Sequence, residues 1–248
     1  MSDLIQSHYA DGILSVNFNR PEKKNALTSE MYAQLADVFD HQATQDNVNV
    51  VVLSAGKDFT AGNDLDDFLA RPPAAEEGAT APVWEFMRAL STCPVPVIAA
   101  VDGFAVGIGT TLLLHCEFVY STPSTVFMLP FINLAAVPEF GSSMLLPMHT
   151  GYVKAAEMLF LGDRFDSETA LKYNLINQIC SSENLMACAM ATAAKLAGKS
   201  REALVQSKAL MRRDIEPLAE RIALESKAFA KRVASPEAKA AISAIMKR

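Results

Sequence analysis

The sequence is poor in cysteine, and its four cysteines form no Cys-x-x-Cys pair. Because cysteines at that spacing are typical of zinc sites and redox-active dithiols, their lack argues against both kinds of site. Most of the cysteines lie in apolar stretches, where a reduced and buried thiol is the usual state. They therefore indicate a protein of a reducing compartment. These residues are Cys93, Cys116, Cys180 and Cys188.

Positive charge is also scarce. Lys and Arg number 22 against 28 Asp and Glu, which gives a formal net charge of −6. Such a chain has no general attraction to nucleic acid or to an anionic membrane, so neither is expected as a partner. No stretch reaches the ~18 uncharged apolar residues that cross a bilayer, and the first residues lack a basic start followed by an apolar run. We expect a soluble, cytoplasmic protein.

Motifs for nucleotides and for metals are missing as well. The glycine-rich segment 103–109 lacks the G-x-G-x-x-G spacing, and no Gly-Lys-Ser or Gly-Lys-Thr follows it. The acidic residues Asp64, Asp66 and Asp67 are better explained as charges at the start of a helix than as a Ca²⁺ or Mg²⁺ site. We therefore predict neither a metal nor a separate cofactor.

The four histidines give no catalytic or metal-binding pattern. His8, His41 and His149 stand at no ligand spacing from a cysteine or a carboxylate. His115 lies in an apolar helical stretch without a partner acid or nucleophile nearby, so we interpret it as a buried histidine whose hydrogen bonds are satisfied.

What is present is ample material for a core, since half of the 248 residues are hydrophobic. Residues 13–18 alternate apolar and polar side chains and follow the Asp11-Gly12 pair, which predicts a hairpin leading into a strand. Thr28 is a candidate N-cap for a helix with one apolar face. The first module should therefore pair a sheet with a covering helix.

The next segment has the pattern of parallel α/β structure. Residues 48–53 and 97–101 are short, β-branched runs, each followed by a glycine-containing loop, and a helical pattern at about 83–90 lies between them. Residues 69–82 are rich in Pro, Ala and Gly, which predicts a mobile loop able to gate a pocket. Further short strands are expected at 118–120 and 125–128.

Beyond about residue 150 the pattern becomes helical. Ala, Leu, Met and Lys recur at helical spacing, and residues 175–179 alone have the pattern of a strand. The expected helices span 153–161, 167–173, 183–197, 200–212 and 215–233.

Two glycine-containing loops, at residues 57–65 and 103–111, each leave a predicted strand and enter a predicted helix. In parallel α/β sheets ligands collect at the carboxyl ends of strands, where such loops expose backbone N–H groups beside positive helix ends. Two such donors aimed at one oxygen suit a thioester carbonyl that becomes an enolate. The alternative is that the glycines only permit tight turns and close helix packing.

These loops belong to a set of four motifs that cover nearly the whole chain. The set comprises 19–27 (Asn-Arg-Pro-Glu-Lys-Lys-Asn-Ala-Leu), 59–65 (Phe-Thr-Ala-Gly-Asn-Asp-Leu), the glycine loop 101–109, and residues 156–162 leading to Ala170. In order and spacing they resemble the crotonase superfamily, also called the enoyl-CoA hydratase/isomerase family.

The resemblance implies an α/β fold, a crotonase-type (ClpP-like) spiral of ββα units followed by a helical region. It divides the chain into a core at 1–195 and a helical trimerisation region at 196–248, and it implies trimers, often stacked as hexamers. The substrate would be an acyl-CoA thioester, with coenzyme A as part of the substrate rather than a cofactor.

The resemblance also assigns residues. The oxyanion-hole N–H groups would belong to Asn63 and Ile108. Positions that hold the two hydratase glutamates of the family hold Thr111 and Phe131 here, so both hydratase acids are absent and these residues would border the substrate instead. Coenzyme A would run past Lys24, Ala26, Ala61, Asp64, Leu65 and Gly107.

One carboxylate, that of Glu139, remains near the positions of the absent acids. Glu139 lies in a nearly uncharged stretch, residues 134–143, and apolar surroundings raise a carboxyl pKa. It could instead be a solvent-facing loop residue or a charge near the start of a helix at 141–148. The Pro-Glu-Phe-Gly-Ser-Ser pattern resembles the peroxisomal type of Δ3,Δ2-enoyl-CoA isomerase, which implies that Glu139 is the catalytic base.

Other readings of the chain stay open at this point. A hydratase or other crotonase-type lyase reaction, and an acyl-CoA-binding protein without catalysis, are the alternatives to an isomerase of fatty acid or related acyl-CoA metabolism. A basic edge of the C-terminal helices is either solvated or contacts CoA phosphates: Lys227, Lys231, Arg232, Lys247 and Arg248. Candidates for the acyl pocket are Phe68, Trp84, Phe86, Met87 and Phe131.

Overall fold

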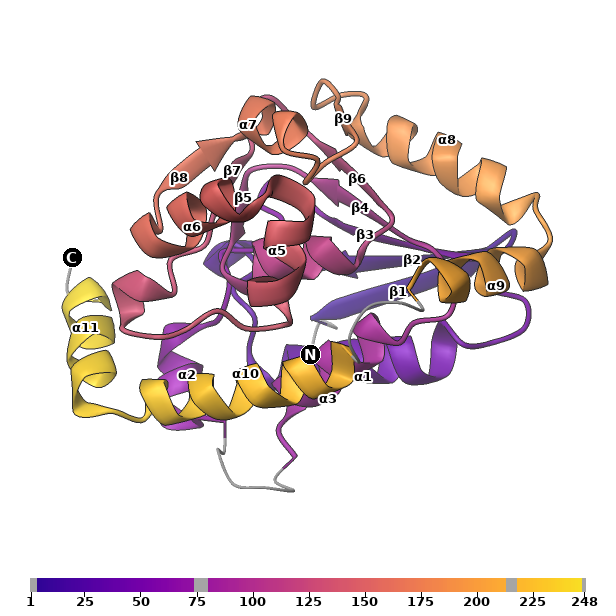
Figure 1. Ribbon diagram of the computed structural model, residues 1–248. Coiled ribbons are helices and arrows are strands. Elements are labelled where there is room, and N and C mark those ends of the chain that lie inside the picture. The colour runs from indigo at the N-terminus through magenta and orange to yellow at the C-terminus, as the bar shows by residue number, and fades with distance from the viewer. Residues whose placement is uncertain (1–3, 74–79, 213–217, 247–248) are drawn as a thin grey trace.

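The computed structural model describes residues 4–73, 80–212 and 218–246. In this part of the chain a six-stranded sheet and a three-stranded sheet are surrounded by helices, and the last third is helical (Figure 1). The strands are β1 (Ile5–Ala10), β2 (Ile13–Phe18), β3 (Val50–Ala55), β4 (Val97–Val101), β5 (Phe104–Val106), β6 (Phe118–Ser121), β7 (Val126–Met128), β8 (Arg164–Asp166) and β9 (Gln178–Ile179).

Helices of very different length connect and cover these strands. The α-helices are α1 (Ser29–Asp37), α2 (Leu65–Ala70), α3 (Pro82–Ser91), α4 (Ile108–Thr111), α5 (Ser142–Thr150), α6 (Tyr152–Leu161), α7 (Ser167–Lys172), α8 (Leu185–Ala197), α9 (Arg201–Met211), α10 (Leu218–Val233) and α11 (Pro236–Met246). Shorter 3-10 segments are η1 (Pro21–Lys23), η3 (Leu112–His115) and η4 (Ile132–Leu134), and α1 continues into a π-helical turn, η2 (Val38–Gln42).

The large sheet begins with the predicted hairpin. β1 and β2 pair antiparallel, and the turn residues Asp11 and Gly12 have φ of 51° and 81°. A two-residue hairpin turn needs this left-handed pair, which Asp-Gly adopts readily. From β2 onward the pairing is parallel, in the order β1-β2-β3-β4-β6-β9. The predicted hairpin and the parallel strands after it are confirmed.

Both faces of the large sheet are buried. Val51 and Leu53 of β3 pack into the core that holds α1 and α3, whereas Val50 and Val52 pack toward α8. Side chains alternate between the two faces of a strand, so a strand covered on both sides has a continuous apolar run. This burial explains the unbroken Val-Val-Val-Leu sequence of β3.

The three-stranded sheet was not predicted as such. Residues 104–106, expected to be part of a loop, form β5, which pairs in parallel with β7, and β7 pairs antiparallel with β8 at 164–166, a segment for which no strand was expected. These strands have only three residues each, too few for a periodic pattern. Their existence depends on partners distant in sequence.

The predicted helices of the last third are confirmed, with shifts of at most two residues at the ends that the structure describes; residues 215–217 of the last one lie outside the described residues. The expected strand at 175–179 is shorter, since only β9 at 178–179 is extended, and α11 was not expected. α10 and α11 contribute Ile222, Phe229 and Ile242 to the main core, and they pack on α2, α3 and η4. Residue 195 falls near the end of α8.

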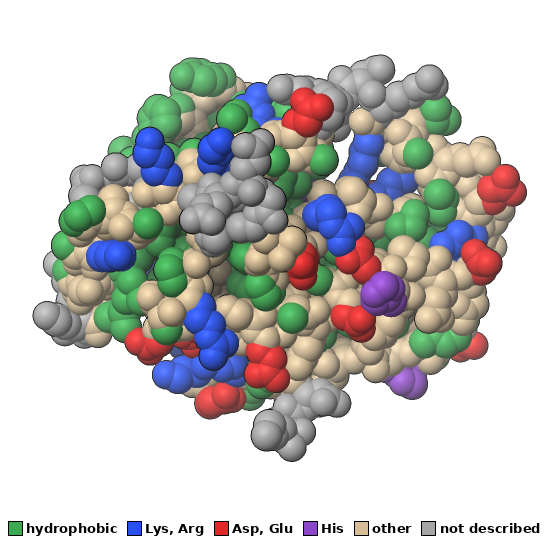
Figure 2. Space-filling view, turned by 90° about the horizontal axis from the view of Figure 1, so that it is seen from below, with side chains coloured by type: hydrophobic (Ala, Val, Ile, Leu, Met, Phe, Trp, Pro, Cys, Tyr) green, Lys and Arg blue, Asp and Glu red, His purple; other side chains and the backbone are tan. Residues whose placement is uncertain are grey.

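The segment 69–82 contains regular structure at both ends, because α2 extends to Ala70 and α3 starts at Pro82. The central part of the expected loop, residues 74–79, lies outside the described residues, as do Lys247, Arg248 and the side chain of Arg232. Lys227 and Lys231 are exposed on α10. The face of the molecule shown in Figure 2 carries acidic and basic side chains interspersed rather than a patch of one sign.

Two glycines allow the glycine loops to touch through their backbones. A Cβ at Gly62, where φ is 90°, would lie 2.6 Å from the carbonyl oxygen of Val106. A Cβ at Gly109 would lie 2.6 Å from Cγ2 and 3.0 Å from the carbonyl oxygen of Thr60. The two loops are also joined by hydrogen bonds, from Thr60 N–H to the Phe104 oxygen and from Val106 N–H to the Thr60 oxygen. Side chains at 62 or 109 would force them apart.

Replacing Gly62 by alanine should therefore lower the free energy of unfolding by about 3 kcal/mol or more, because strained φ and steric overlap add. Urea denaturation followed by circular dichroism measures this change. Gly56→Ala is the matched control, since Gly56 has no atom within 4 Å of an added Cβ; it should change stability by less than about 0.5 kcal/mol. Equal effects of the two substitutions would refute the close-approach argument.

Candidate active site

The backbone N–H of Asn63 points away from Leu27, the residue with which Asn63 forms an isolated bridge. Leu27 and Asn63 form a parallel bridge in which Leu27 N–H donates to the Gly62 oxygen at 2.8 Å and accepts at its own oxygen from Asp64 N–H at 2.9 Å. Adjacent amides of an extended backbone point to opposite sides. The Asn63 N–H therefore faces the other way, and within the described ranges it has no hydrogen-bond acceptor.

The second exposed donor is at the start of α4. Gly107, with φ of 57°, is the N-cap, and its N–H donates to the Met128 oxygen at 2.9 Å. Ile108 is the first residue of the helix, and first-turn N–H groups have no intrahelical partner. No acceptor for the Ile108 N–H is found in the described part of the chain. Helix N-termini also carry partial positive charge, which favours an anionic oxygen there.

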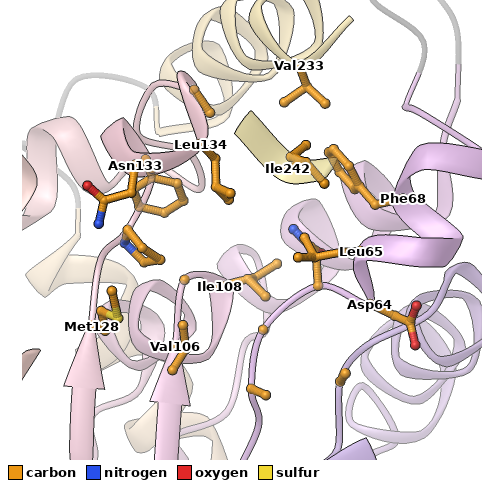
Figure 3. Close-up of a pocket in the computed structure, with 18 of the residues that line it drawn as sticks. Asp64, Leu65, Phe68, Val106, Ile108, Met128, Asn133, Leu134, Val233 and Ile242 are labelled. Atoms are coloured by element: carbon orange, nitrogen blue, oxygen red, sulfur yellow. The ribbon is translucent and has the colours of Figure 1, made fainter. Parts of the chain in front are cut away.

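Both donors border a cavity of about 550 Å³. Apolar side chains from three distant parts of the chain converge on it, as Figure 3 shows for Leu65, Ile108 and Ile242. Of the residues assigned to the site by resemblance, those that line the cavity are Ala26, Ala61, Asn63, Asp64, Leu65, Gly107, Ile108 and Phe131. A largely apolar pocket with a few convergent polar groups is typical of a small-molecule site.

Three assigned residues lie elsewhere: Lys24, Thr111 and Glu139 are not among the residues that line this cavity. The Lys24 ammonium lies 4.1 Å from the centroid of the Phe104 ring, and Lys23 reaches the cavity instead.

Asp64, which lines the cavity, also stabilises the start of α2. Its carboxylate accepts from Arg20 at 2.6 Å and from Asp67 N–H at 3.1 Å, which makes it the N-cap of α2. Burial acts to raise the pKa of Asp64, but the hydrogen bonds from Asp67 and Arg20 outweigh it and hold this pKa below its usual value. Asp66 follows in the first turn, so the predicted charge set at the helix start is confirmed.

Glu139 is a buried carboxyl, 1% exposed. Its Oε1 accepts from the Thr111 hydroxyl at 2.6 Å, and its Oε2 has no partner in the described part of the molecule. Burial raises the pKa of Glu139 to about 8, the charge of Glu225 adds to the rise, and the Thr111 hydrogen bond opposes it. A solvent-facing position for Glu139 is therefore wrong. An unpartnered buried oxygen is costly and is often functional.

Glu139 interacts with Thr111 through a hydrogen bond and with Tyr32 through its charge, and each of these two residues lies within hydrogen-bond distance of one donor residue at another atom. The Thr111 hydroxyl lies 2.6 Å from Glu139 Oε1 and 3.4 Å from the Ile108 carbonyl oxygen, so its one proton is better placed to bond Glu139. The Tyr32 hydroxyl donates to Oδ1 of Asn63. Burial raises the pKa of Tyr32, and the neighbouring charge of Glu139 raises it further. The Glu139 carboxyl thus interacts with two side chains that also hydrogen-bond the residues of the two donors.

Sequence reasoning missed the contribution of the C-terminal helices to the cavity. Phe229 contacts Phe68, Trp84 and Phe131 with ring centroids 5.8, 6.4 and 6.3 Å apart. The helical spacing of residues 215–233 predicted a helix, but it did not indicate where in the molecule this helix would pack. The missed lining residues of α10 and α11 are Phe229, Val233, Ile242 and Met246.

The acyl-pocket candidates divide into two groups. Phe68 and Phe131 line the cavity, whereas Phe86 and Met87 are fully buried in the main core. Trp84 packs against Phe229 without lining the cavity.

His115 is buried, as predicted, but the expectation that its hydrogen bonds are satisfied holds for only one of its two ring nitrogens. Its Nε2 lies 2.8 Å from the Phe140 oxygen, its ring stacks on Phe140 with centroids 4.0 Å apart, and its Nδ1 has no partner among the described residues. Burial lowers the pKa of His115 to about 3, so the ring is neutral. In the described ranges no three His, Cys, Asp or Glu side chains group closely enough to hold a metal ion. No helix there is long and apolar enough to span a bilayer.

Comparisons with known proteins identify the family of this chain. A family model described as enoyl-CoA hydratase/isomerase matches residues 8–248. The 1,2-epoxyphenylacetyl-CoA isomerase of Escherichia coli (strain K12) is 34% identical over 79% of this chain and 77% of its own. Enoyl-CoA delta isomerase 2 of Rattus norvegicus is 36% identical over 68% of this chain, and the match spans only 44% of that longer protein.

Similarity extends to solved structures. OdaA of Pseudomonas aeruginosa superposes with a TM-score of 0.94 over 100% of both chains, at 42% identity. The predicted crotonase fold is therefore confirmed, with its helical C-terminal region. Fold, motifs and family match together show that this chain is an enzyme of the enoyl-CoA hydratase/isomerase family, within the crotonase superfamily.

Proposed function

We propose that the protein is an enoyl-CoA isomerase that converts a 3-enoyl-CoA into the trans-2-enoyl-CoA. The observation that carries this proposal is the buried carboxyl of Glu139, whose Oε2 has no hydrogen-bond partner among the described residues. Moving a double bond needs one group that takes a proton and returns it. Glu139, with a pKa raised to about 8, suits both steps near neutral pH.

The chemistry follows from the positions of the polar groups. Ionised Glu139 removes a proton from C2 of the substrate, and the electron pair moves onto the thioester oxygen. The N–H groups of Asn63 and Ile108 stabilise that enolate oxygen. Glu139 then returns the proton to C4, the enolate collapses, and the double bond lies between C2 and C3. No water enters and no atom is lost.

Hydration is less well supported. It needs a second group to protonate carbon while water is activated. The two positions that would supply these acids hold Thr111, which is bound to Glu139, and Phe131, an apolar wall of the cavity. Proton transfer also requires the acyl group to open a path to Glu139, since that residue is 1% exposed and does not line the cavity.

We further propose an acyl-CoA thioester as the substrate, with no separate cofactor, and a cytoplasmic trimer or dimer of trimers as the assembly. Exposed apolar side chains of α6 support an assembly interface, because Tyr152, Val153 and Phe160 are 75%, 82% and 66% exposed.

Glu139→Gln should reduce turnover of 3-enoyl-CoA by about 10²-fold or more, because the amide cannot accept the proton. Binding of the substrate thioester should persist. Ultraviolet absorbance of the conjugated product measures turnover, and calorimetry measures binding. Glu202→Gln, a change to an exposed glutamate of α9, is the control and should match the wild type.

Three results would overturn the assignment. Unchanged turnover in Glu139→Gln would exclude Glu139 as the base. Hydration of crotonyl-CoA that depends on Glu139 would indicate a hydratase. Tight acyl-CoA binding with neither turnover nor exchange of the substrate α-proton would indicate a binding protein without catalysis.

The pH dependence of kcat/KM should follow Glu139. Activity should rise with pH through a midpoint near 8, because the base must be ionised. Thr111→Val removes the hydroxyl that stabilises the ionised form, so its midpoint should lie at higher pH than that of the wild type. Identical profiles for the two proteins would show that another group controls the rate.

Stability should also depend on pH through Glu139. The folded-state pKa of about 8 exceeds the usual value of 4.5, so between these pH values folding takes up a proton and stability falls as pH rises. Glu139→Gln removes this loss. Relative to wild type, its free energy of unfolding should grow by about 1.4 kcal/mol per pH unit across that window. Thermal or urea unfolding at pH 5 and pH 8 tests this, and a pH-independent difference would contradict it.

A further inference from the structure

α10 carries a second buried acid next to the Glu139 turn. Glu225 is 6% exposed, and its carboxylate accepts from the N–H of Gly141 and from both the N–H and the hydroxyl of Ser143. α5 has no side-chain cap of its own, since its N-cap is Gly141. Glu225 therefore caps α5 from another helix, and its negative charge complements the positive end of the helix dipole.

The turn that Glu225 holds is the one that presents Glu139. Phe140 and Gly141 have φ of 59° and 71°, so two consecutive residues after Glu139 are left-handed. For Phe140 this conformation is strained and needs support from its surroundings. Within the turn, the Ser142 hydroxyl donates to the backbone carbonyl oxygen of Glu139 at 2.6 Å. From helix α10, the Glu225 carboxylate holds the turn by accepting a hydrogen bond from the Gly141 N–H.

The same face of α10 forms a wall of the cavity. Glu225, Phe229 and Val233 follow one another at helical spacing of four residues, and Phe229 and Val233 line the cavity. At the other end of this face, Leu218 lies so close to Gly141 that an added Cβ would meet its Cδ1 at 2.6 Å. α10 runs beneath α5 in Figure 1. One rigid element thus contacts both the substrate cavity and the turn of Glu139.

We propose that Glu225 is a positioning residue for the reaction: from the helix that walls the cavity, it holds the turn that presents Glu139. This inference rests on the proposed role of Glu139 as the base. It predicts that correct docking of α10 and correct placement of Glu139 occur together.

The effect of the Glu225 charge on the pKa of Glu139 can be measured. The charge of Glu225 adds to the rise in the pKa of Glu139 that burial causes. The other polar groups around Glu139 carry no charge: the Thr111 hydroxyl, the Tyr32 phenol and the neutral ring of His115, which stacks on Phe140. Burial raises the pKa of Glu225 itself, against its hydrogen bonds from Gly141 and Ser143 and the charge of Arg221.

The test compares Glu225→Gln and Glu225→Ala with Glu220→Gln, an exposed residue of the same helix that undergoes the same charge change. Glu225→Gln should move the midpoint of the kcat–pH profile to lower pH, because the repelling charge is lost. Glu225→Ala leaves the α5 donors without their acceptor and should lower kcat about tenfold or more, with partial rescue by Gln. Glu220→Gln should behave as the wild type.

The readouts separate this inference from the proposed function. Titration of the ¹³C-labelled Glu139 carboxyl by NMR reports its pKa whether or not Glu139 is the base. An unchanged Glu139 titration in folded Glu225→Gln overturns the inference, even where Glu139→Gln is inactive. Active Glu139→Gln overturns the proposed function instead. Should Glu225→Ala not fold, the titration of Glu225→Gln decides.

Discussion

The site depends on the backbone contact between the two glycine loops. At Gly62 and Gly109 the loops approach so closely that no side chain fits, and hydrogen bonds between residues 60 and 104–106 fix their separation. Each loop alone would expose one N–H at a strand end. Because the two loops are held together, the backbone N–H groups of Asn63 and Ile108 border the same cavity. Preorganised donors of this kind stabilise developing charge without reorganising during the reaction.

Glu139 is a group whose burial is costly to the fold. A buried, partly unpaired carboxyl favours its neutral form, which destabilises the native state at neutral and alkaline pH. The same desolvation makes its ionised form a stronger base. Thr111, in a position that would hold an acid in a hydratase, instead donates to the carboxylate and moderates the rise in its pKa. The threonine at the position of a hydratase acid is therefore in direct contact with Glu139.

The C-terminal helices link stability to the site. α10 and α11 bury Ile222, Phe229 and Ile242 in the main core, and Phe229 also lies against the cavity. Because the cavity wall is part of the core, changes in helix packing and changes in pocket shape cannot be separated. The carboxylate of Glu225 extends this connection to the turn of Glu139.

Local sequence determined a large part of this protein. The Asp11-Gly12 hairpin, the buried runs of β3 and β4 and most helices follow from patterns within a few residues, because turn conformation and one-sided burial act locally. The motifs resembling the crotonase superfamily located Asn63, Ile108 and Glu139. Tertiary structure alone decided the rest. β5 and β8, which were not expected, are too short to have a period, and Tyr32, Phe229 and Glu225 reach the site only because helices far apart in sequence pack together. The sequence left open whether Glu139 is buried or faces solvent; its burial, and with it the raised pKa, is a property of the packed molecule, since desolvation comes from neighbours that the local sequence does not name.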